Sequence, residues 1–277
     1  MEALKFGPFV VPLERAYVAL AVLGVLLSAE LLARRVRPSL AQWAWNAVLV
    51  GLVAARLGYV LAHLEAYRVE PLAVLYFWQG GFSPAVGVLA AAAYTLWFFR
   101  GDGRTLRYAL LSALIGGLVA ASLFSLSARR AAESEVLPAW RLPTPHGGVL
   151  DLGQFRGRPL VLNFWASWCP PCRREMPLLL EFARREREVA FVFVNSGENA
   201  ETVRAYLERS GLDIPNLALD ESGRLTRRFR VVALPTTLFF DAEGRLRARH
   251  LGELSRAALS DYLKKIRGRA QASGQTR

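Results

Sequence analysis

The sequence predicts two fold classes in one chain: a multi-pass α-helical membrane domain, followed by an α/β domain with a central mixed sheet flanked by helices. The 277 residues are 53% hydrophobic, which is more than an ordinary soluble domain carries. Long uncharged runs fall within residues 16–127, whereas residues 128–277 have a mixed, globular composition. We expect a membrane domain over 1–127, a linker over 128–136, an α/β domain over 137–268 and a flexible tail over 269–277.

About four membrane spans are expected in the first half, near residues 16–33, 43–64, 80–99 and 108–126. A cleaved signal peptide is the rival interpretation of the first span. The start of the chain lacks a purely basic segment, however, and Arg34, Arg35 and Arg37 follow the apolar run. Before the third span, residues 71–78 are expected to be interfacial or re-entrant, and Ser83-Pro84 is typical of a helix start.

Charge in the loops predicts the orientation of these spans. Residues 34–42 and 100–107 are rich in arginine and should stay cytoplasmic, whereas residues 65–70 carry Arg68 among acids. Four spans with the N-terminus outside satisfy this pattern. We therefore expect a multi-pass protein of the cell membrane whose α/β domain faces the periplasm or its equivalent.

Arg56 lies inside the second predicted span. An ionised side chain at the centre of a membrane helix costs about 2.5 to 3.5 kcal/mol even on the mild insertion scale. Arg56 therefore either has a partner or a wet cavity, as a site residue would, or extends its side chain to an interface.

The same region resembles a known family. Residues 55–61 read Ala-Arg-Leu-Gly-Tyr-Val-Leu, and Pro71 and then Trp78-Gln79-Gly80-Gly81 follow. This resembles the N-terminal half of prolipoprotein diacylglyceryl transferase, over a truncated and degenerate membrane domain (about 16–127). That family has a Ser-Phe-His-Gly-Gly type loop with a functional histidine where this chain has Ser-Pro-Ala-Val-Gly at 83–87. The resemblance implies a scaffold or lipid-binding role, with candidate residues Arg56, Tyr59, Gln79, Gly80 and Gly81.

The second half alternates buried strands with amphipathic helices. Residues 159–166 and 190–195 are apolar enough for buried strands, and a helix between them begins at a cysteine motif and continues through Pro177. A helix over 199–210 and a short one near 222–229 precede strands at 236–240 and 245–252. A last helix starts after Ser255. The predicted order is βαβ followed by αββα.

The chain has two cysteines, Cys169 and Cys172, which excludes a structural framework of several disulfides. We expect no metal, because His63, His146 and His250 lack the spacing of zinc ligands. The net charge of +12 comes from scattered arginines without a basic recognition helix. We therefore expect attraction to an anionic lipid bilayer rather than a nucleic-acid partner.

The run Asn163-Phe-Trp-Ala-Ser-Trp-Cys-Pro-Pro-Cys172, with Glu175-Met-Pro177 and a later Leu234-Pro235-Thr236, resembles the TlpA/ResA branch of thioredoxin-like proteins over residues 137–268. The resemblance implies a thioredoxin-like fold and a thiol:disulfide oxidoreductase. It also implies a cis-proline loop at Leu234-Pro235, and an acidic role for Glu175, since Asn163 stands where thioredoxin has a buried aspartate.

The two cysteines are expected to form the redox pair. A cysteine at a helix N-terminus has its pKa lowered from about 8.5 into the ~3.5 to 7.5 range, which suits Cys169 as the attacking thiolate and Cys172 as the resolving thiol. Glu175 shares a helical face with Cys172 and is a candidate proton relay, the alternative being a solvated surface glutamate. Trp165 is expected in the core. The predicted substrate-binding residues are Trp168, Pro170, Pro171, Leu234, Pro235 and Thr236.

The leading hypothesis is a reductant of disulfides in secreted proteins such as apocytochrome c, as the resemblance implies. The redox disulfide is expected to work without a cofactor. Because the spans contain no cysteine, electrons should come from a separate membrane donor, a thiol transporter of the DsbD or CcdA kind. Two alternatives are a disulfide-forming oxidase on the same scaffold, and a lipid-modifying or lipid-binding membrane protein with a redox appendage.

Overall fold

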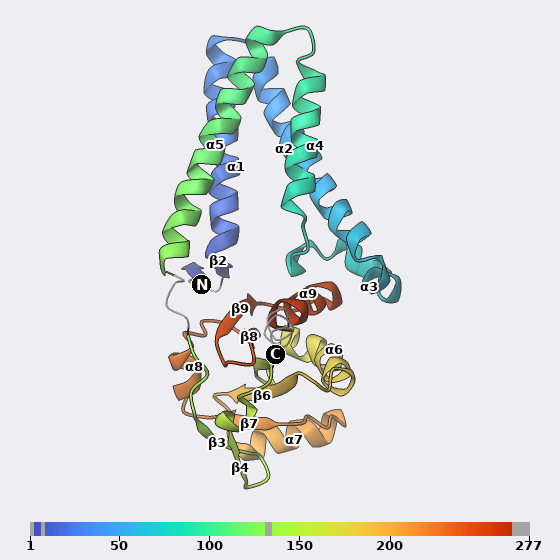
Figure 1. Ribbon diagram of the computed structural model, residues 1–277, viewed down its shortest axis with the longest axis vertical. Helices are drawn as coiled ribbons and strands as arrows, with labels where there is room; N and C mark the ends of the chain where they lie inside the picture. Colours follow the sequence, from blue (N-terminus) through green and yellow to red (C-terminus); the bar gives the residue numbers. More distant parts are fainter. Residues whose placement is uncertain (1–2, 7–8, 131–134, 268–277) are drawn as a thin grey trace, which may run out of the picture. The chain divides into compact units, whose positions relative to one another are not determined.

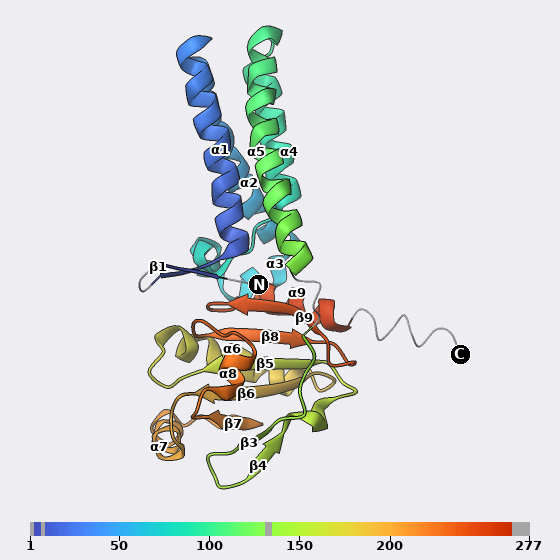
Figure 2. The same ribbon diagram turned by 90° about the vertical axis from the view of Figure 1, so that its left-hand side faces the viewer.

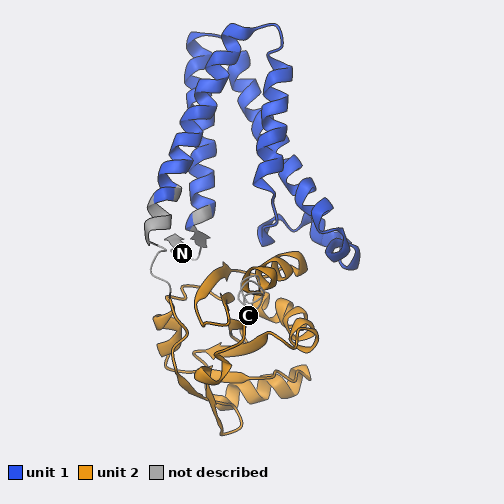
Figure 3. Cartoon of the chain, viewed as in Figure 1, with its two compact units in different colours: residues 1–132 blue, residues 133–277 orange. Residues whose placement is uncertain are grey.

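A computed structural model describes residues 3–6, 9–130 and 135–267 (Figures 1 and 2). The chain divides into two compact units, Met1–Ala132 and Glu133–Arg277 (Figure 3). Each unit has a hydrophobic core of its own. The predicted tail, residues 269–277, lies outside the described residues.

Unit 1 opens with a short antiparallel hairpin of β1 (Ala3–Phe6) and β2 (Phe9–Pro12). Its long helices are α1 (Leu13–Arg35), α2 (Ser39–Ala62) and α5 (Gly103–Arg130), each long and apolar enough to cross a membrane. Between α2 and α5 lie α3 (Leu64–Val69), the 3-10 helices η1 (Pro71–Leu75) and η2 (Phe77–Gln79), and α4 (Pro84–Phe98).

Helix α4 is shorter than the third predicted span. It has 15 residues, and at about 1.5 Å per residue it reaches less far than a hydrocarbon core of about 30 Å. Residues 80–83 are outside the helix, which begins with Pro84 in its first turn and Ser83 at the N-cap position. The predicted linker overlaps the end of α5 at Arg130, and residues 131–134 are outside the described part.

The helices of unit 1 pack as two pairs, α1 with α5 and α2 with α4 (Figure 1). Small residues let the second pair approach closely, because a Cβ added to Gly87 would lie 2.8 Å from the carbonyl oxygen of Gly51. The loops α1–α2 and α4–α5 are joined by an ion pair between Arg37 and Asp102 at 3.0 Å. Both loops therefore lie at the same end of the unit.

Unit 2 is built around a five-stranded mixed sheet in the order β7-β6-β5-β8-β9. The strands are β5 (Leu160–Trp165), β6 (Ala190–Ser196), β7 (Leu217–Asp220), β8 (Thr236–Phe240) and β9 (Leu246–Leu251). Strands β5, β6 and β7 are parallel, and β8 is antiparallel to both β5 and β9. The helices are α6 (Pro170–Arg185), α7 (Ala200–Ser210), α8 (Arg224–Arg228) and α9 (Arg256–Arg267).

Every strand and helix that the sequence predicted in unit 2 is present. Two strand features were missed: the edge strand β7, and the hairpin of β3 (Arg141–Pro143) and β4 (Val149–Asp151), which is followed by the 3-10 helix η3 (Leu152–Phe155). The missed strands have three or four residues, too few for a periodic pattern. This central mixed sheet with flanking helices is a thioredoxin-like fold.

Candidate redox site

Cys169 and Cys172 form a disulfide with an S–S distance of 2.09 Å, at the start of α6. Cys169 is the N-cap residue of the helix, and Cys172 lies in its first turn. The side chains are almost fully buried, at 3% and 0% exposure, within the core cluster that packs against one face of the sheet. The predicted redox pair is therefore assembled at a helix N-terminus.

The first turn of α6 offers few backbone donors to the sulfur of Cys169. Pro170 and Pro171 occupy its first two positions and have no N–H. The first available donor is the N–H of Cys172, which lies 3.3 Å from Cys169 Sγ. An N-cap side chain ordinarily accepts from the second or third residue of a helix, and here the third supplies the bond.

Glu175, one turn further along α6, is buried at 2% exposure, so the alternative of a solvated surface glutamate is wrong. Its Oε1 accepts from Asn163 Nδ2 at 2.9 Å, and its Oε2 accepts from the backbone N–H of Leu254 at 3.0 Å. Burial raises the pKa of Glu175 to about 8, against the opposing effect of these two hydrogen bonds. A carboxyl that titrates near neutral pH is suited to proton transfer.

The Leu234-Pro235 peptide bond is cis, as the resemblance implied. Thr236 begins β8 and pairs with Phe164 near the end of β5. Because β8 runs antiparallel to β5, the residues just before Thr236 lie at the edge of the sheet where β5 leads into the cysteine motif. Leu234 packs against the cluster that contains both cysteines.

The two tryptophans of the motif have different environments. Trp165 is fully buried and its ring lies 5.6 Å from that of Tyr206, so its prediction as a core residue is confirmed. Trp168, directly before Cys169, is 67% exposed. An exposed indole beside the disulfide is available for contact with another molecule.

Sequence reasoning missed a polar cluster that holds the loop before Cys169. Glu198 accepts from the backbone N–H of Ser167 at 2.7 Å, from its hydroxyl at 2.5 Å, and from Asn195 Nδ2 at 2.7 Å. Ser167 follows β5 and Glu198 follows β6. The carboxyl ends of neighbouring parallel strands meet at one edge of a sheet. The predicted order of the strands could therefore have placed Ser167 and Glu198 close together.

In unit 1, the structure brings the predicted membrane-domain residues together around Arg56. Its guanidinium donates to the carbonyl oxygens of Ala73, Val74, Gly80 and Gly81 at 2.6 to 3.0 Å. A Cβ on Gly81 would lie 2.7 Å from Arg56 Nη1 and 2.8 Å from Tyr59 Cε1. Gln79, which directly precedes the two glycines in the sequence, is buried. Arg56 therefore has partners, as a site residue would, and they are backbone carbonyls.

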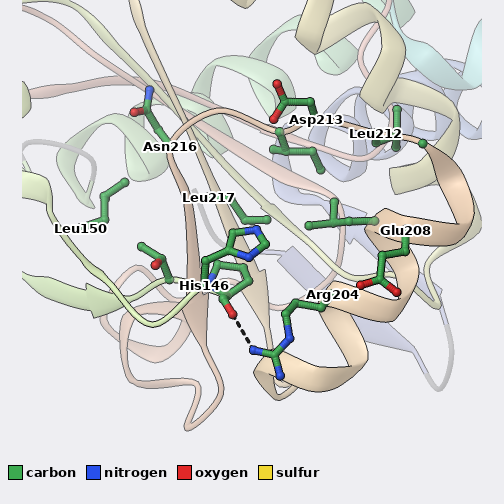
Figure 4. A pocket seen from close by; sticks show the side chains of 13 residues that line it. His146, Leu150, Arg204, Glu208, Leu212, Asp213, Asn216 and Leu217 are labelled. Carbon is green, nitrogen blue, oxygen red and sulfur yellow. Dashed lines mark hydrogen bonds between the residues drawn. The ribbon is translucent and has the colours of Figure 1, made fainter.

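A groove of about 570 Å³ opens elsewhere in unit 2, between the β3–β4 hairpin and α7 (Figure 4). Leucines such as Leu150, Leu207 and Leu217 line it together with His146 and Arg204, whose Nη1 donates to the carbonyl of Pro145 at 2.7 Å. The cysteines and the other predicted site residues are not among the lining residues. The redox chemistry is therefore not located in this groove.

Comparisons with known proteins agree with this geometry. Residues 131–266 match the Redoxin family model, and residues 2–125 match the model of prolipoprotein diacylglyceryl transferase. The chain is 31% identical to the thiol-disulfide oxidoreductase ResA of Geobacillus thermodenitrificans, over 59% of this chain and 94% of that protein. It is 32% identical to the thioredoxin-like protein YneN of Bacillus subtilis, over 47% of this chain and 78% of that protein.

Among solved structures, a thiol:disulfide interchange protein DsbE from Chlorobium tepidum matches with 27% identity and a TM-score of 0.42, over 47% of this chain and 94% of that one. The fold and the disulfide site define a thioredoxin-like thiol:disulfide oxidoreductase. The chain belongs to the ResA-like thiol-disulfide oxidoreductases, with residues 131–266 matching the Redoxin family model, and its N-terminal residues 2–125 are similar to prolipoprotein diacylglyceryl transferase.

Proposed function

We propose that the protein is a membrane-anchored, extracytoplasmic reductant of disulfides in secreted proteins, of which apocytochrome c is the leading candidate. One observation carries the proposal: a disulfide at the start of a helix, with the N–H of Cys172 directed at Cys169 Sγ, and a buried carboxyl one turn away. The ResA relatives support the same class of reaction.

In the reduced protein, the Cys169 thiolate attacks one sulfur of the substrate disulfide. A bond between Cys169 and that sulfur forms, the substrate bond breaks, and the second substrate sulfur leaves as a thiolate that takes up a proton. The Cys172 thiol then loses its proton and attacks Cys169 Sγ. This step forms the Cys169–Cys172 disulfide and releases the first substrate sulfur, so two electrons pass to the substrate.

Glu175 is proposed to accept the proton of Cys172 in the second step and to return it when the disulfide is reduced again. It follows Cys172 by three positions and therefore lies on the same face of α6. Its pKa of about 8 allows it to exchange a proton under neutral conditions. Trp168 and the residues Pro170, Pro171, Leu234, Pro235 and Thr236 are proposed to form the surface that binds the substrate.

The proposed location of the redox unit follows from the positive charge of two loops in unit 1. The loop that carries Arg37 and the loop of Asp102 lie at one end of unit 1, and arginine-rich loops stay cytoplasmic. We propose that the redox unit lies on the opposite, periplasmic side. Reduction of the disulfide then requires a separate membrane donor of the DsbD or CcdA kind, because the two cysteines are the only ones in the chain and no other cofactor is proposed.

Trapping of mixed disulfides tests the role of each cysteine. In Cys172→Ser, the attack by Cys169 proceeds but resolution stops, so substrates accumulate as covalent adducts that mass spectrometry identifies. Cys169→Ser is the matched control and should trap nothing. Equal trapping by the two variants would overturn the assignment.

The direction of electron flow is tested by the reduction potential. A reductant should have a potential near the thioredoxin range of about −270 mV, whereas a disulfide-forming oxidase lies near −120 mV. Equilibration with a glutathione or dithiothreitol couple, followed by alkylation, measures this potential. A value close to that of the oxidase would replace the reductant proposal with the disulfide-forming alternative.

The match of residues 2–125 favours a second role, lipid binding by unit 1. The chain has Pro84 and Ala85 in the segment where the family carries its functional histidine, so we propose binding rather than transfer. A variant with both cysteines replaced separates this role from redox chemistry. Diacylglyceryl transfer by that variant would establish the lipid-modifying alternative.

A further inference from the structure

Asn163, on the central strand β5, makes an asymmetric set of contacts beside the redox site. Its Nδ2 donates to Glu175 Oε1 and to Thr237 Oγ1, each at 2.9 Å. Its Oδ1 is fully buried and has no hydrogen-bond partner among the residues that the structure describes. A buried amide oxygen without a partner is costly, by about 1 to 3 kcal/mol, and therefore calls for an explanation.

The contacts around Glu175 suit one of its two protonation states. Both of its oxygens accept from N–H donors, those of Asn163 and Leu254, which matches an ionised carboxylate. Protonation adds an O–H donor that needs an acceptor. If Asn163 kept its orientation, the acid form would contain two unsatisfied groups, the new O–H and Asn163 Oδ1.

Rotation of the Asn163 amide by half a turn removes one of these unsatisfied groups. The oxygen and nitrogen ends of an amide have nearly the same shape, so the rotation exchanges their positions without a change in packing. Oδ1 would then accept from the Glu175 O–H and from the Thr237 hydroxyl, which rotates freely. The Nδ2 group, with its two N–H donors, is then left without a partner, in place of Oδ1, with its two lone pairs, which lacks a partner beside the carboxylate.

We propose that Asn163 is a positioning residue whose side-chain amide turns over when Glu175 gains or loses its proton, so that it donates to the carboxylate and accepts from the acid. This inference rests on the proposed proton relay through Glu175 and deepens it. The relay then exchanges protons without leaving either state of Glu175 unsupported, and Asn163 does not itself carry the proton.

Two charged groups near this pair must be held constant in any test. Glu253, in the segment after β9, acts on Glu175 by raising its pKa, and Arg174 on α6 pairs with Glu253 at 2.8 Å. Both cysteines lie at the start of α6, just before Glu175, so the redox state must be fixed as well. The oxidised protein meets that condition.

The amide orientation is measured by NMR on the full chain in detergent micelles, with ¹⁵N in asparagine only. The sequence has five asparagines, and Asn163→Leu identifies the signal of Asn163. Well above pH 8, the amide protons should show nuclear Overhauser effects to the Thr237 methyl and to the side chain of Glu175. Well below pH 8, these effects should be lost, because Oδ1 then faces both groups. Identical effects at the two pH values would overturn the proposal.

Glu175→Gln is the matched control, because its side chain does not titrate. In this variant the Asn163 amide should keep one orientation at every pH. A pH-dependent change that persisted in Glu175→Gln would show that another group drives the rotation, and would also overturn the proposal.

The pH profile of disulfide exchange gives a second readout that a purely structural role would not move. Asn163→Asp supplies acceptors only, supports the acid form, and should move the midpoint of the profile upward by about one pH unit. Asn163→Leu supports neither form and should slow exchange by about tenfold. If Glu175→Gln itself leaves exchange unchanged, the relay fails. If the relay holds and the amide does not turn, only the present inference fails.

Discussion

The contribution of the Glu175 carboxyl to stability should depend on pH in the direction opposite to that of an ion-paired carboxyl. Its pKa in the folded protein is about 8, above the ordinary value of 4.5, so the folded state binds more protons than the unfolded state between these values. The contribution of Glu175 to stability should therefore fall as the pH rises through this window, by about 1.4 kcal/mol per pH unit and about 5 kcal/mol in total.

Glu175→Gln removes this dependence, because glutamine is neutral throughout. The difference in melting temperature between the variant and the wild type should shift in favour of the variant as pH rises from 4.5 to 8. Circular dichroism of the full chain in micelles measures it. Glu181→Gln is the control: hydrogen bonds from Arg256 lower the pKa of Glu181, so its contribution to stability is complete above its ordinary pKa and is lost at acid pH. A flat difference for Glu175→Gln would refute the buried, raised pKa.

In unit 1, position 81 requires a glycine. Its φ of +81° and its closeness to Arg56 both oppose a side chain, and Arg56 cannot move aside without losing bonds to backbone carbonyls. Gly81→Ala should speed hydrogen exchange of residues 71–83 by tenfold or more. Gly80→Ala, at φ +82° and with Arg15 Nη2 at 3.7 Å as the one atom of the described residues near the added Cβ, is the control for backbone strain alone. Equal effects of the two variants would show that Arg56 does not hold this segment.

The sequence predicted which residues form the site better than it predicted the contacts of those residues. The spacing of Cys169, Cys172 and Glu175 placed all three on the first turns of one helix. The burial of Glu175 could not be foreseen, because it depends on Leu254, whose N–H comes from a segment 79 positions away. The partners of Arg56 were equally hidden, since backbone carbonyls leave no trace in the residue types.

The N-terminus of α6 determines how many backbone N–H groups can donate to the sulfur of Cys169. Pro171→Ala restores an N–H at the second helical position, from which an N-cap side chain ordinarily accepts. A second donor stabilises the thiolate of the reduced form by about 1.4 kcal/mol, so the reduction potential should rise by about 30 mV.

Pro170→Ala is the matched control for this prediction. It removes the same ring, but its N–H lies at the first helical position, which does not face the N-cap side chain. Equilibrium with a glutathione couple gives the potential of each variant. A larger shift for Pro170→Ala than for Pro171→Ala would mean that loop rigidity, rather than hydrogen bonding, sets the potential.

The elements themselves were predictable where their patterns were long. Strands β5 and β6 are mostly apolar runs, and α7 and α9 have apolar residues at helical spacing. These patterns were sufficient to predict the four elements. Strand β7 has four residues and takes its place by pairing with β6, which is a tertiary effect. The third span was overestimated because the apolar run includes residues that bind Arg56 instead of continuing a helix.

The proposed location of the redox unit depends on the orientation of unit 1 in the membrane. The ion pair between Arg37 and Asp102 ties two loops together, so α1 and α5 each have one end in this arginine-rich region. The opposite end of α5 leads to the redox unit. If the arginine-rich end lies in the cytoplasm, as proposed above, the redox unit lies on the extracytoplasmic side.

Labelling of the cysteines tests this arrangement directly, because Cys169 and Cys172 are the only thiols in the chain. After reduction with a membrane-permeant phosphine, a charged maleimide that does not cross membranes should label Cys169 in intact spheroplasts. Lysed spheroplasts show the full extent of labelling, and Cys169→Ser should remove the faster-reacting site. Cys169 is the informative thiol, because it is the N-cap residue of α6 and its sulfur accepts from the N–H of Cys172, which favours its thiolate. Labelling that required lysis would place the redox unit in the cytoplasm and would exclude secreted proteins as its substrates.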